Sequence, residues 1–183
     1  MIKVLAGILI GVIAGVTLSF SKWQPALADT PAAYNDRALH FVPPADYQAL
    51  DVPPVDLQEQ NHLATVAAYV HNPGREDQLS IQIMLELFDG SLKDFEATVE
   101  NELRAQVDGI FVARKIETRL SNGMPAWWLK AAFGEGFGSM QQYLYAAVDG
   151  RRGVTVSVTG RLGVITEDKA RDALKDLALV VYP

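Results

Sequence analysis

The chain has 183 residues, of which 49% are hydrophobic and 21% are charged, a balance typical of one globular domain and not of a disordered or collagen-like chain. Its 16 Lys and Arg against 22 Asp and Glu leave a net charge of −6, which disfavours nucleic acid and anionic lipid headgroups as partners. It contains no cysteine, which excludes a disulfide framework, a cysteine nucleophile and a lipid-anchored cysteine.

The first 28 residues have the layout of a signal peptide. Lys3 provides a basic start, residues 4–20 carry no charge, and Ala26 and Ala28 form an A-x-A cleavage site. We expect cleavage after Ala28, which would leave a chain that starts at Asp29 and has a net charge of −8.

An uncleaved membrane anchor is the alternative for this leader. Its 17 uncharged residues lie at the short limit for crossing a bilayer about 30 Å thick. With either outcome the folded part is exported, to the periplasm or the extracellular space, and it contacts the membrane only through an uncleaved leader.

Residues 29–36 are small and polar and are predicted to form a flexible lead-in, and residues 37–183 are predicted to form one domain. The domain begins with a proline-rich stretch that includes "FVPPADY" at 41–47 and "DVPPVD" at 51–56. Proline cannot donate a hydrogen bond to a sheet, so this stretch predicts only short edge strands.

A β-hairpin is predicted next. "ATVAAYV" at 64–70 has strand composition, "HNPGRED" at 71–77 is a turn, and "LSIQIMLELF" at 79–88 alternates between apolar and polar residues. The alternation places an apolar set on one face and a polar set on the other: Leu79, Ile81, Ile83, Leu85 and Leu87 against Ser80, Gln82 and Glu86.

Two helices are predicted, each with a recognisable N-terminal cap. Ser91 and Asp94 resemble a capping box before a helix from about Leu92 to Gln106. Thr166 is expected to cap a second helix over "TEDKARDALKDLALVV". Apolar residues at helical spacing form one buried stripe on each helix, Leu92, Phe95, Val99 and Leu103 on the first and Ala170, Leu174, Leu177 and Val181 on the second.

Two tryptophans lie side by side in a predicted strand over residues 126–133. A strand over 111–120 precedes it, and Asn122-Gly123 predicts a type I′ turn between the two. In the first of these strands, Val112, Ile116 and Leu120 are expected on one face, and Lys115, Glu117 and Arg119 on the other.

Successive side chains of a strand point to opposite faces, so Trp127 and Trp128 cannot form one platform. Trp127 joins Leu129, Ala131 and Phe133 and is predicted to be core. Trp128 shares a mixed and less buried face with Lys130, which makes these two residues candidates for binding a partner.

The final hairpin, over residues 141–160, turns at Asp149-Gly150. Its second strand is predicted to place Val154, Val156 and Val158 inside and Thr155, Ser157 and Thr159 outside. Arg151 and Arg152 lie at its tip, where they are either solvated or contact an anion or carboxylate of a partner.

Common catalytic motifs are absent from the sequence, including H-E-x-x-H, G-x-S-x-G and the Walker A pattern. Residues 134–139 match G-x-G-x-G, one residue short of the dinucleotide fingerprint, and are interpreted as a hairpin loop. Glu86, Glu117 and Glu135 could act as acid and base, but nothing in the sequence brings two of them together. No catalytic residue and no cofactor are predicted.

The three histidines, His40, His62 and His71, show no metal-ligand spacing on one element. A surface metal site at His71 with Glu76 and Asp77 is conceivable. Polar residues populate turns so commonly that solvated loop residues are the preferred interpretation. We therefore expect no metal.

The order of these elements resembles the PsbP-like fold, which is shared by an extrinsic photosystem II subunit and by exported bacterial proteins of the DcrB kind. The resemblance covers about Leu39 to Tyr182, and its most specific pieces are "FVPPADY", "NGMPAWW", the final hairpin and "EDKARDALKDLALVV". It implies an α+β fold, an antiparallel β-sheet with two main helices packed on it.

Members of that family are mostly non-enzymatic proteins that support or bind membrane-associated complexes. We accordingly expect an exported, non-catalytic binding or assembly module with a protein partner in the cell envelope, and the candidate partner-binding residues are Trp128, Lys130, Arg151 and Arg152. A hydrolase or other enzyme with a site of dispersed residues is the first alternative. A membrane-anchored structural protein is the second.

Overall fold

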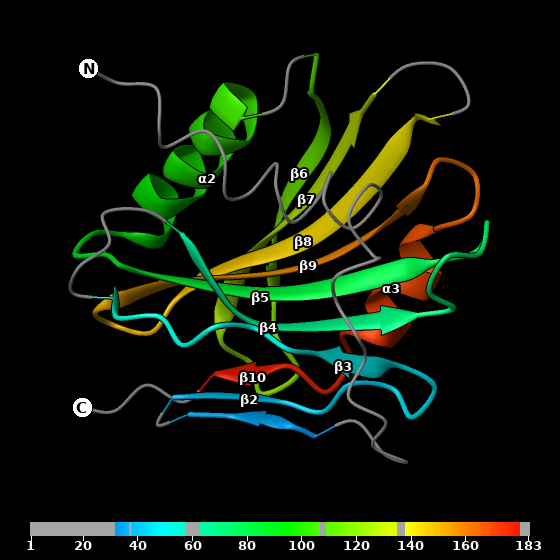
Figure 1. Cartoon of the computed structure of the whole chain (residues 1–183). Helices are drawn as coiled ribbons and strands as arrows, with labels where there is room; N and C mark the ends of the chain where they lie inside the picture. Colours follow the sequence, from blue (N-terminus) through cyan, green and yellow to red (C-terminus); the bar gives the residue numbers. More distant parts are fainter. Residues whose placement is uncertain (1–31, 37, 58–62, 107–108, 135–137, 180–183) are drawn as a thin grey trace, which may run out of the picture.

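The computed structural model describes residues 32–36, 38–57, 63–106, 109–134 and 138–179. Its main sheet has seven antiparallel strands in the order β3-β4-β5-β9-β8-β7-β6 (Figure 1). These strands are β3 (Gln48–Leu50), β4 (Ala64–His71), β5 (Leu79–Leu87), β6 (Phe111–Arg119), β7 (Pro125–Phe133), β8 (Met140–Val148) and β9 (Arg152–Arg161). A second sheet, in the order β1-β2-β10, consists of β1 (Tyr34–Asn35), β2 (Leu39–Phe41) and β10 (Ala178–Leu179).

The predicted leader over residues 1–28, with its uncharged segment 4–20 and its cleavage site, lies outside the described residues, as do His62, Glu135 and Val181. Part of the expected flexible lead-in is described, and Tyr34–Asn35 of it forms strand β1, which pairs with β2. No helix in the described part of the chain is both long and apolar enough to cross a bilayer.

The predicted fold class, one antiparallel sheet with two main helices packed on it, is wrong. The chain is mostly β-sheet, in two antiparallel sheets, and its described helices are short. They are α2 (Leu92–Gln106), with 15 residues, and α3 (Glu167–Ala173), with only seven.

Helix α3 ends early because neighbouring segments bind the chain that follows it. Thr166 caps its start as predicted, accepting a hydrogen bond from the Lys169 amide at 3.3 Å. After the helix, Ser121 donates to the Leu177 carbonyl at 2.6 Å and Asn122 donates to the Leu179 carbonyl. These carbonyls and the pairing of β10 with β2 hold the C-terminal segment extended.

Helix α2 occupies the predicted range, and its capping box is confirmed. The Ser91 amide donates to the Asp94 carboxylate and the Asp94 amide donates to the Ser91 hydroxyl, both at 3.2 Å. Its apolar stripe is buried at Phe95, Val99 and Leu103, with exposed fractions of 4% or less. Helix formation here follows from local signals and from one continuous apolar face.

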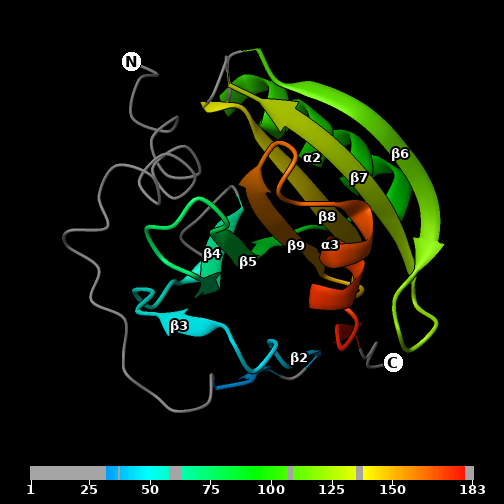
Figure 2. The same ribbon diagram turned by 90° about the vertical axis from the view of Figure 1, so that its right-hand side faces the viewer.

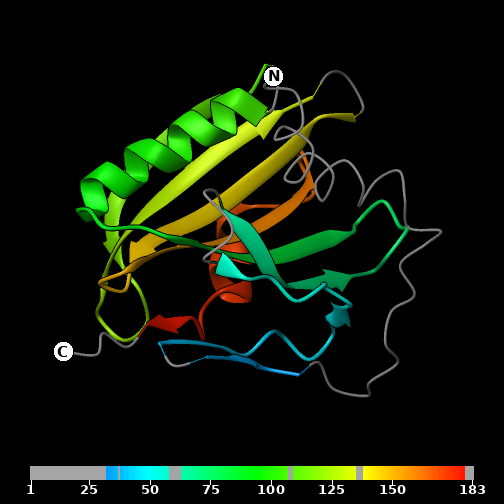
Figure 3. The same ribbon diagram turned by 60° about the vertical axis from the view of Figure 1, so that its left-hand side comes forward.

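The main sheet is covered on both faces. Helix α2 lies over β7 and β8 on one face, and α3 lies on the opposite face (Figures 2 and 3). We call these the α2 face and the α3 face. On the α2 face, one hydrophobic cluster joins α2 to Met84, Leu129 and Leu144 of the sheet. On the α3 face, a second cluster joins α3 and the small sheet to strand residues that point the other way, such as Ile83, Trp128 and Val156.

Two of the predicted hairpins are confirmed: β4 pairs with β5, and β8 pairs with β9. The turn at Asn122-Gly123 differs from the predicted type I′ turn, because only Gly123 has a positive φ, of +87°. Leu120 accepts from the Gly123 amide and donates to the Met124 carbonyl, each at 2.9 Å. This is a three-residue connection ending in a left-handed glycine, another common hairpin geometry.

The predicted face assignment in β6 is wrong at Val112. A register shift between Val112 and Arg114 breaks the alternation of side chains. Val112 lies opposite Ala131 on the α2 face, whereas Ile116 lies opposite Trp128 on the α3 face. An inserted residue of this kind is invisible to a pattern of period two.

Gly153 tests the packing of α2 on the sheet. A methyl group at this position would lie 2.0 Å from the Phe95 ring, so we expect Gly153→Ala to lower the free energy of unfolding by about 1–3 kcal/mol, as overpacked cores do. Gly138→Ala is the control, because nothing lies within 4 Å of its added methyl group. Equal urea midpoints for the two variants would contradict this packing.

Candidate functional site

The two tryptophans occupy opposite faces of β7, as strand parity predicts, but the predicted burial of Trp128 is wrong. Trp128 is 0% exposed and belongs to the cluster under α3, whereas Trp127 is partly buried against the cluster under α2. The Arg171 guanidinium of α3 lies 4.5 Å from the centre of the Trp128 ring. Helix α3 therefore covers the face that was expected to be open, and Trp128 is not a surface anchor.

The other predicted partner-binding residues do not form one site, because Lys130 lies in β7 whereas Arg151 and Arg152 lie at the β8–β9 turn. Lys130 is half-buried on the α3 face of β7, with its Nζ atom 5.6 Å from the centre of the Tyr143 ring. Arg151 is exposed in the β8–β9 turn. Its neighbour Arg152 pairs with Asp36 at 2.8 Å and Asp149 at 2.6 Å, so that this arginine joins β1 to the turn.

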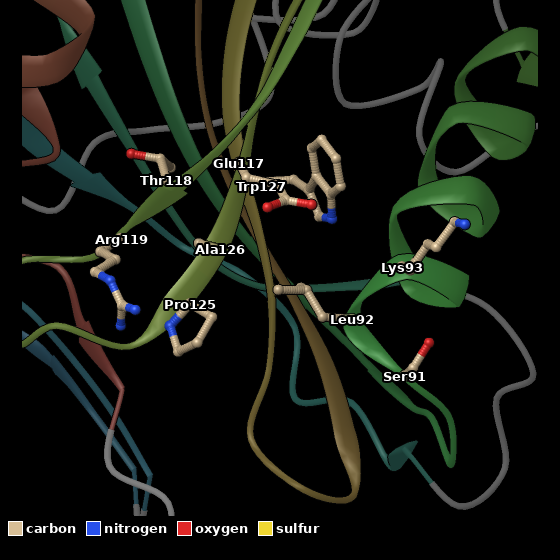
Figure 4. Close-up of a pocket in the computed structure, with 9 residues that line it drawn as sticks. All are labelled: Ser91, Leu92, Lys93, Glu117, Thr118, Arg119, Pro125, Ala126 and Trp127. Atoms are coloured by element: carbon tan, nitrogen blue, oxygen red, sulfur yellow. The ribbon is translucent and has the colours of Figure 1, made fainter.

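A groove of about 740 Å³ lies between the start of α2 and the β6–β7 hairpin. Figure 4 shows Glu117 and Trp127 projecting from the strands toward α2, with Leu92 pointing back from the helix. The lining residues are Ser91, Leu92, Lys93, Glu117, Thr118, Arg119, Pro125, Ala126 and Trp127. We call this space the Trp127 groove.

The Trp127 groove has an apolar floor and charged residues at its rim. Glu117 and Trp127 are direct cross-strand neighbours, so the exposed carboxylate lies beside the half-buried indole. Arg119 donates to the Gly123 carbonyl at 2.7 Å, which orients it along the hairpin. Such a surface can bury an apolar side chain against Trp127 and contact polar groups around it.

Sequence reasoning did not assign this groove. The sequence predicts Trp127 as a core residue, and it predicts Glu117 on the polar face of its strand and as one of three possible acids or bases. The groove forms because the capped start of α2 lies beside the start of β7, although these two segments are distant in the chain. The only signal in the sequence was that Trp127 and Glu117 lie on either side of a hairpin turn.

A strip of buried polar residues lies on the α2 face of the sheet. It includes polar residues of β5 and β9 that the sequence predicts to face solvent. Five of its side chains are 0–6% exposed: Gln82 and Glu86 of β5, Gln142 of β8, and Thr155 and Ser157 of β9. Gln82 lies directly opposite Ser157 in the sheet. We use the name polar strip for these five residues.

Each of these five side chains has at least one buried polar atom without a hydrogen-bond partner. Gln82 Oε1, Glu86 Oε1, both amide atoms of Gln142 and the hydroxyls of Thr155 and Ser157 are buried without a hydrogen-bond partner. Glu102 of α2 has an unpartnered buried oxygen as well. Burial raises the pKa of Glu86 to about 7, and repulsion from Glu102 adds to that rise. Burial also raises the pKa of Glu102 above its usual range.

The structure does not bring Glu86 and Glu117 together as an acid–base pair. Their strands, β5 and β6, are separated by β9, β8 and β7, which corresponds to about 19 Å at the usual strand spacing. The carboxyl group that influences Glu86 is that of Glu102.

A shallow site near His71 offers no metal centre. The His71 Nδ1 atom lies 3.1 Å from a carboxylate oxygen of Asp46, and the hollow of about 240 Å³ around them also includes Asp77 and Asp172. The part of the chain that the structure describes holds no group of three His, Asp or Glu side chains arranged to bind a metal.

Comparison with known proteins adds no assignment. No family model matches the sequence, and no curated protein matches it. Among solved structures, PA94 from Pseudomonas aeruginosa, a protein of unknown function, is similar at 11% sequence identity and a TM-score of 0.47. The match covers 74% of this chain and 85% of that chain, and at these values it identifies neither a family nor a function.

The two tryptophans provide a test of the burial described above. Trp128→Ala should cost about 3–5 kcal/mol, as large aromatic deletions from cores do, and Trp127→Ala should cost clearly less because its ring is only partly buried. Acrylamide quenching of single-tryptophan variants, each carrying Trp23→Phe, should show Trp127 as the more accessible ring. Greater quenching of Trp128 would contradict the structure.

Glu86 should make stability depend on pH. Its folded pKa of about 7 exceeds the ordinary value of 4.5, so the folded chain binds more protons between these values and loses stability as pH rises through that interval. Relative to the wild type, Glu86→Gln should gain about 1–3 kcal/mol in the free energy of unfolding between pH 5 and pH 8. Urea titrations at both values measure this, with Glu76→Gln as an exposed control. Parallel pH profiles for the Glu86 variant and the wild type would disprove it.

Proposed function

We propose that this chain is an exported, non-catalytic binding module that holds a segment of a cell-envelope protein in the Trp127 groove. The observation that carries the proposal is the half-buried Trp127 ring at the floor of a groove of about 740 Å³. Pockets that bind ligands commonly have volumes of about 300–1,000 Å³. Tryptophan is among the residues that most often anchor protein interfaces.

The lining of the groove favours binding over catalysis. Its one serine, Ser91, donates its hydroxyl hydrogen to the Asp94 carboxylate at 2.6 Å and caps α2, so this hydroxyl already has a structural role. Leu92 and Pro125 add apolar surface to the groove near Trp127 (Figure 4). Lys93 and Glu117 supply opposite charges at the rim, which suits a polypeptide with both polar and apolar side chains.

Export and kinship are parts of the same proposal. The layout of the leader, from Lys3 to the A-x-A site at Ala28, supports export. The pieces "FVPPADY" and "NGMPAWW" support kinship with the PsbP-like proteins, and the second of these pieces includes Trp127. The expectation of a protein partner comes from that resemblance, whereas its place of binding comes from the groove.

Site-specific photo-crosslinking in the native cell envelope tests the proposal. A photoreactive phenylalanine analogue at exposed Pro125, on the rim of the groove, should give a discrete protein adduct. The same analogue at Glu76, whose side chain is 92% exposed in the β4–β5 loop, should not. Position 76 therefore controls for random encounters.

Substitutions combined with the photoreactive residue at position 125 then test whether the adduct depends on the groove. Trp127→Ala should abolish the adduct, whereas Phe111→Ala should leave it intact because Phe111 is 65% exposed and does not line the groove. Circular dichroism verifies that both variants are folded. Adducts of equal yield from positions 76 and 125, or an adduct that survives Trp127→Ala, would overturn the proposal.

A further inference from the structure

Strand β6 is an open edge of the main sheet. It is the last strand in the order β3-β4-β5-β9-β8-β7-β6, and its only partner among the described strands is β7. Figure 2 shows β6 as the outermost strand, with no described segment beyond it. On that outer side, its backbone N–H and C=O groups form no hydrogen bond with the described part of the chain. Such an edge can accept one more strand.

The two edges of the sheet differ in length. The opposite edge, β3, has three residues, and proline pairs at 43–44 and 53–54 on either side of it limit its extension. Strand β6 has nine residues. Its register shift lies between Val112 and Arg114, so residues 114–119 form a regular ladder with β7. Five or more residues of β6 are therefore free to pair with another strand.

The regular part of β6 is complementary to its own copy. When two such segments pair antiparallel about Ile116, Lys115 of each copy lies opposite Glu117 of the other. Arg114 then lies opposite Thr118, and Ile116 lies opposite itself. Directly opposed residues of opposite charge stabilise an antiparallel pair, and the two-fold symmetry of a homodimer forms each contact twice.

The nearest alternative registers place like charges together. Pairing about Lys115 brings this lysine opposite its own copy. Pairing about Glu117 does the same to the glutamate and places Lys115 opposite Arg119. Because like charges directly opposite each other destabilise a strand pair, the charge pattern selects the register about Ile116.

The surroundings of these side chains suit that register. Lys115 Nζ is held on the α2 face by Glu96 at 2.9 Å and Glu100 at 2.8 Å, while its side chain remains 45% exposed. Glu117 is exposed, and among the described residues the ion pairs of β6 do not include it. Ile116 is half-buried against the cluster under α3, so pairing would cover its remaining surface.

We propose that β6 pairs with β6 of a second copy of this chain, antiparallel and centred on Ile116, so that the two main sheets become continuous. Helix α2 lies over β7 and β8, which leaves the edge clear for the second copy. Because Glu117 lines the Trp127 groove, Lys115 of the second copy would bring a cation to the rim of that groove. The pairing itself does not depend on the function proposed for the groove.

Cysteine crosslinking of the full chain tests the pairing, because the sequence contains no cysteine of its own. In the proposed register, Ile116→Cys places two Cα atoms about 4.5–5.5 Å apart, within the range of about 4.4–6.8 Å that a disulfide needs. We expect mild oxidation to convert most of this variant into a covalent dimer. Glu76→Cys, at a side chain that is 92% exposed, should remain mostly monomeric.

A mixture of two other variants tests the register without changing Ile116. Arg114→Cys and Thr118→Cys should each stay monomeric alone, because the equivalent thiols are four residues apart along the paired strands, roughly 14 Å. Mixed together, the two variants should form a covalent heterodimer. Circular dichroism verifies that every variant is folded.

Sedimentation of the full chain, without cysteines, tests the role of charge. We expect the mass to rise toward that of two chains between about 1 and 100 µM, as for an interface of modest area. Glu117→Lys places a lysine opposite Lys115 and should weaken this association at least tenfold. Glu76→Lys, at an exposed side chain, should leave it unchanged.

Other results would overturn the inference. A monomer at every concentration, with no crosslink at position 116 or in the mixture, would show that the register shift and Lys115 keep this edge unpaired, as such features do in many sheets. Equal crosslinking at positions 76 and 116, or a dimer that Glu117→Lys leaves intact, would place the interface elsewhere. Efficient crosslinking of Arg114→Cys alone would show another register.

Discussion

Strand β9 is buried on both faces, and the positions of the helices and of the second sheet follow from that burial. Eight of its ten residues are buried, and it pairs with β5 on one side and β8 on the other. Its valines require an apolar cover on the α3 face, which α3 and the small sheet provide. Gly153 gives the Phe95 ring of α2 room to approach the other face. A central strand of an antiparallel sheet more often has one solvated face, so this double cover is the main constraint on the molecule.

The cover on both faces of the sheet also explains the different environments of Trp127 and Trp128. Trp128 is enclosed between Tyr143, Tyr145 and the Arg171 guanidinium, while Glu167 holds that guanidinium at 2.9 Å. A cation over an indole face is favourable, and more so when water is excluded. Trp128 is buried on the α3 face. Trp127 therefore points to the opposite face of β7, where it lies beside the start of α2 and lines the groove.

The α2 face combines two chemically different regions. Under the helix, Leu129, Leu144 and Met84 form an apolar core with Phe95 and Val99. The polar strip lies beside that core, and the Trp127 groove lies at the start of β7. The Trp127 groove therefore belongs to the face that α2 covers only in part, and α2 contributes Leu92 and Lys93 to it.

Local signals in the sequence determined the hairpins, the capping box at Ser91, the Thr166 cap and the opposite orientation of the two tryptophans, because these depend on turn chemistry and strand parity. Tertiary structure decided which faces are buried: residues of one parity in β5 and β9 look exposed in the sequence, yet Gln82 and Ser157 lie inside. It also decided the length of α3, because carbonyls bound by Ser121 and Asn122 and the pairing with β2 override a helical pattern. The groove and the strip join segments distant in the chain, and no local pattern encodes such contacts.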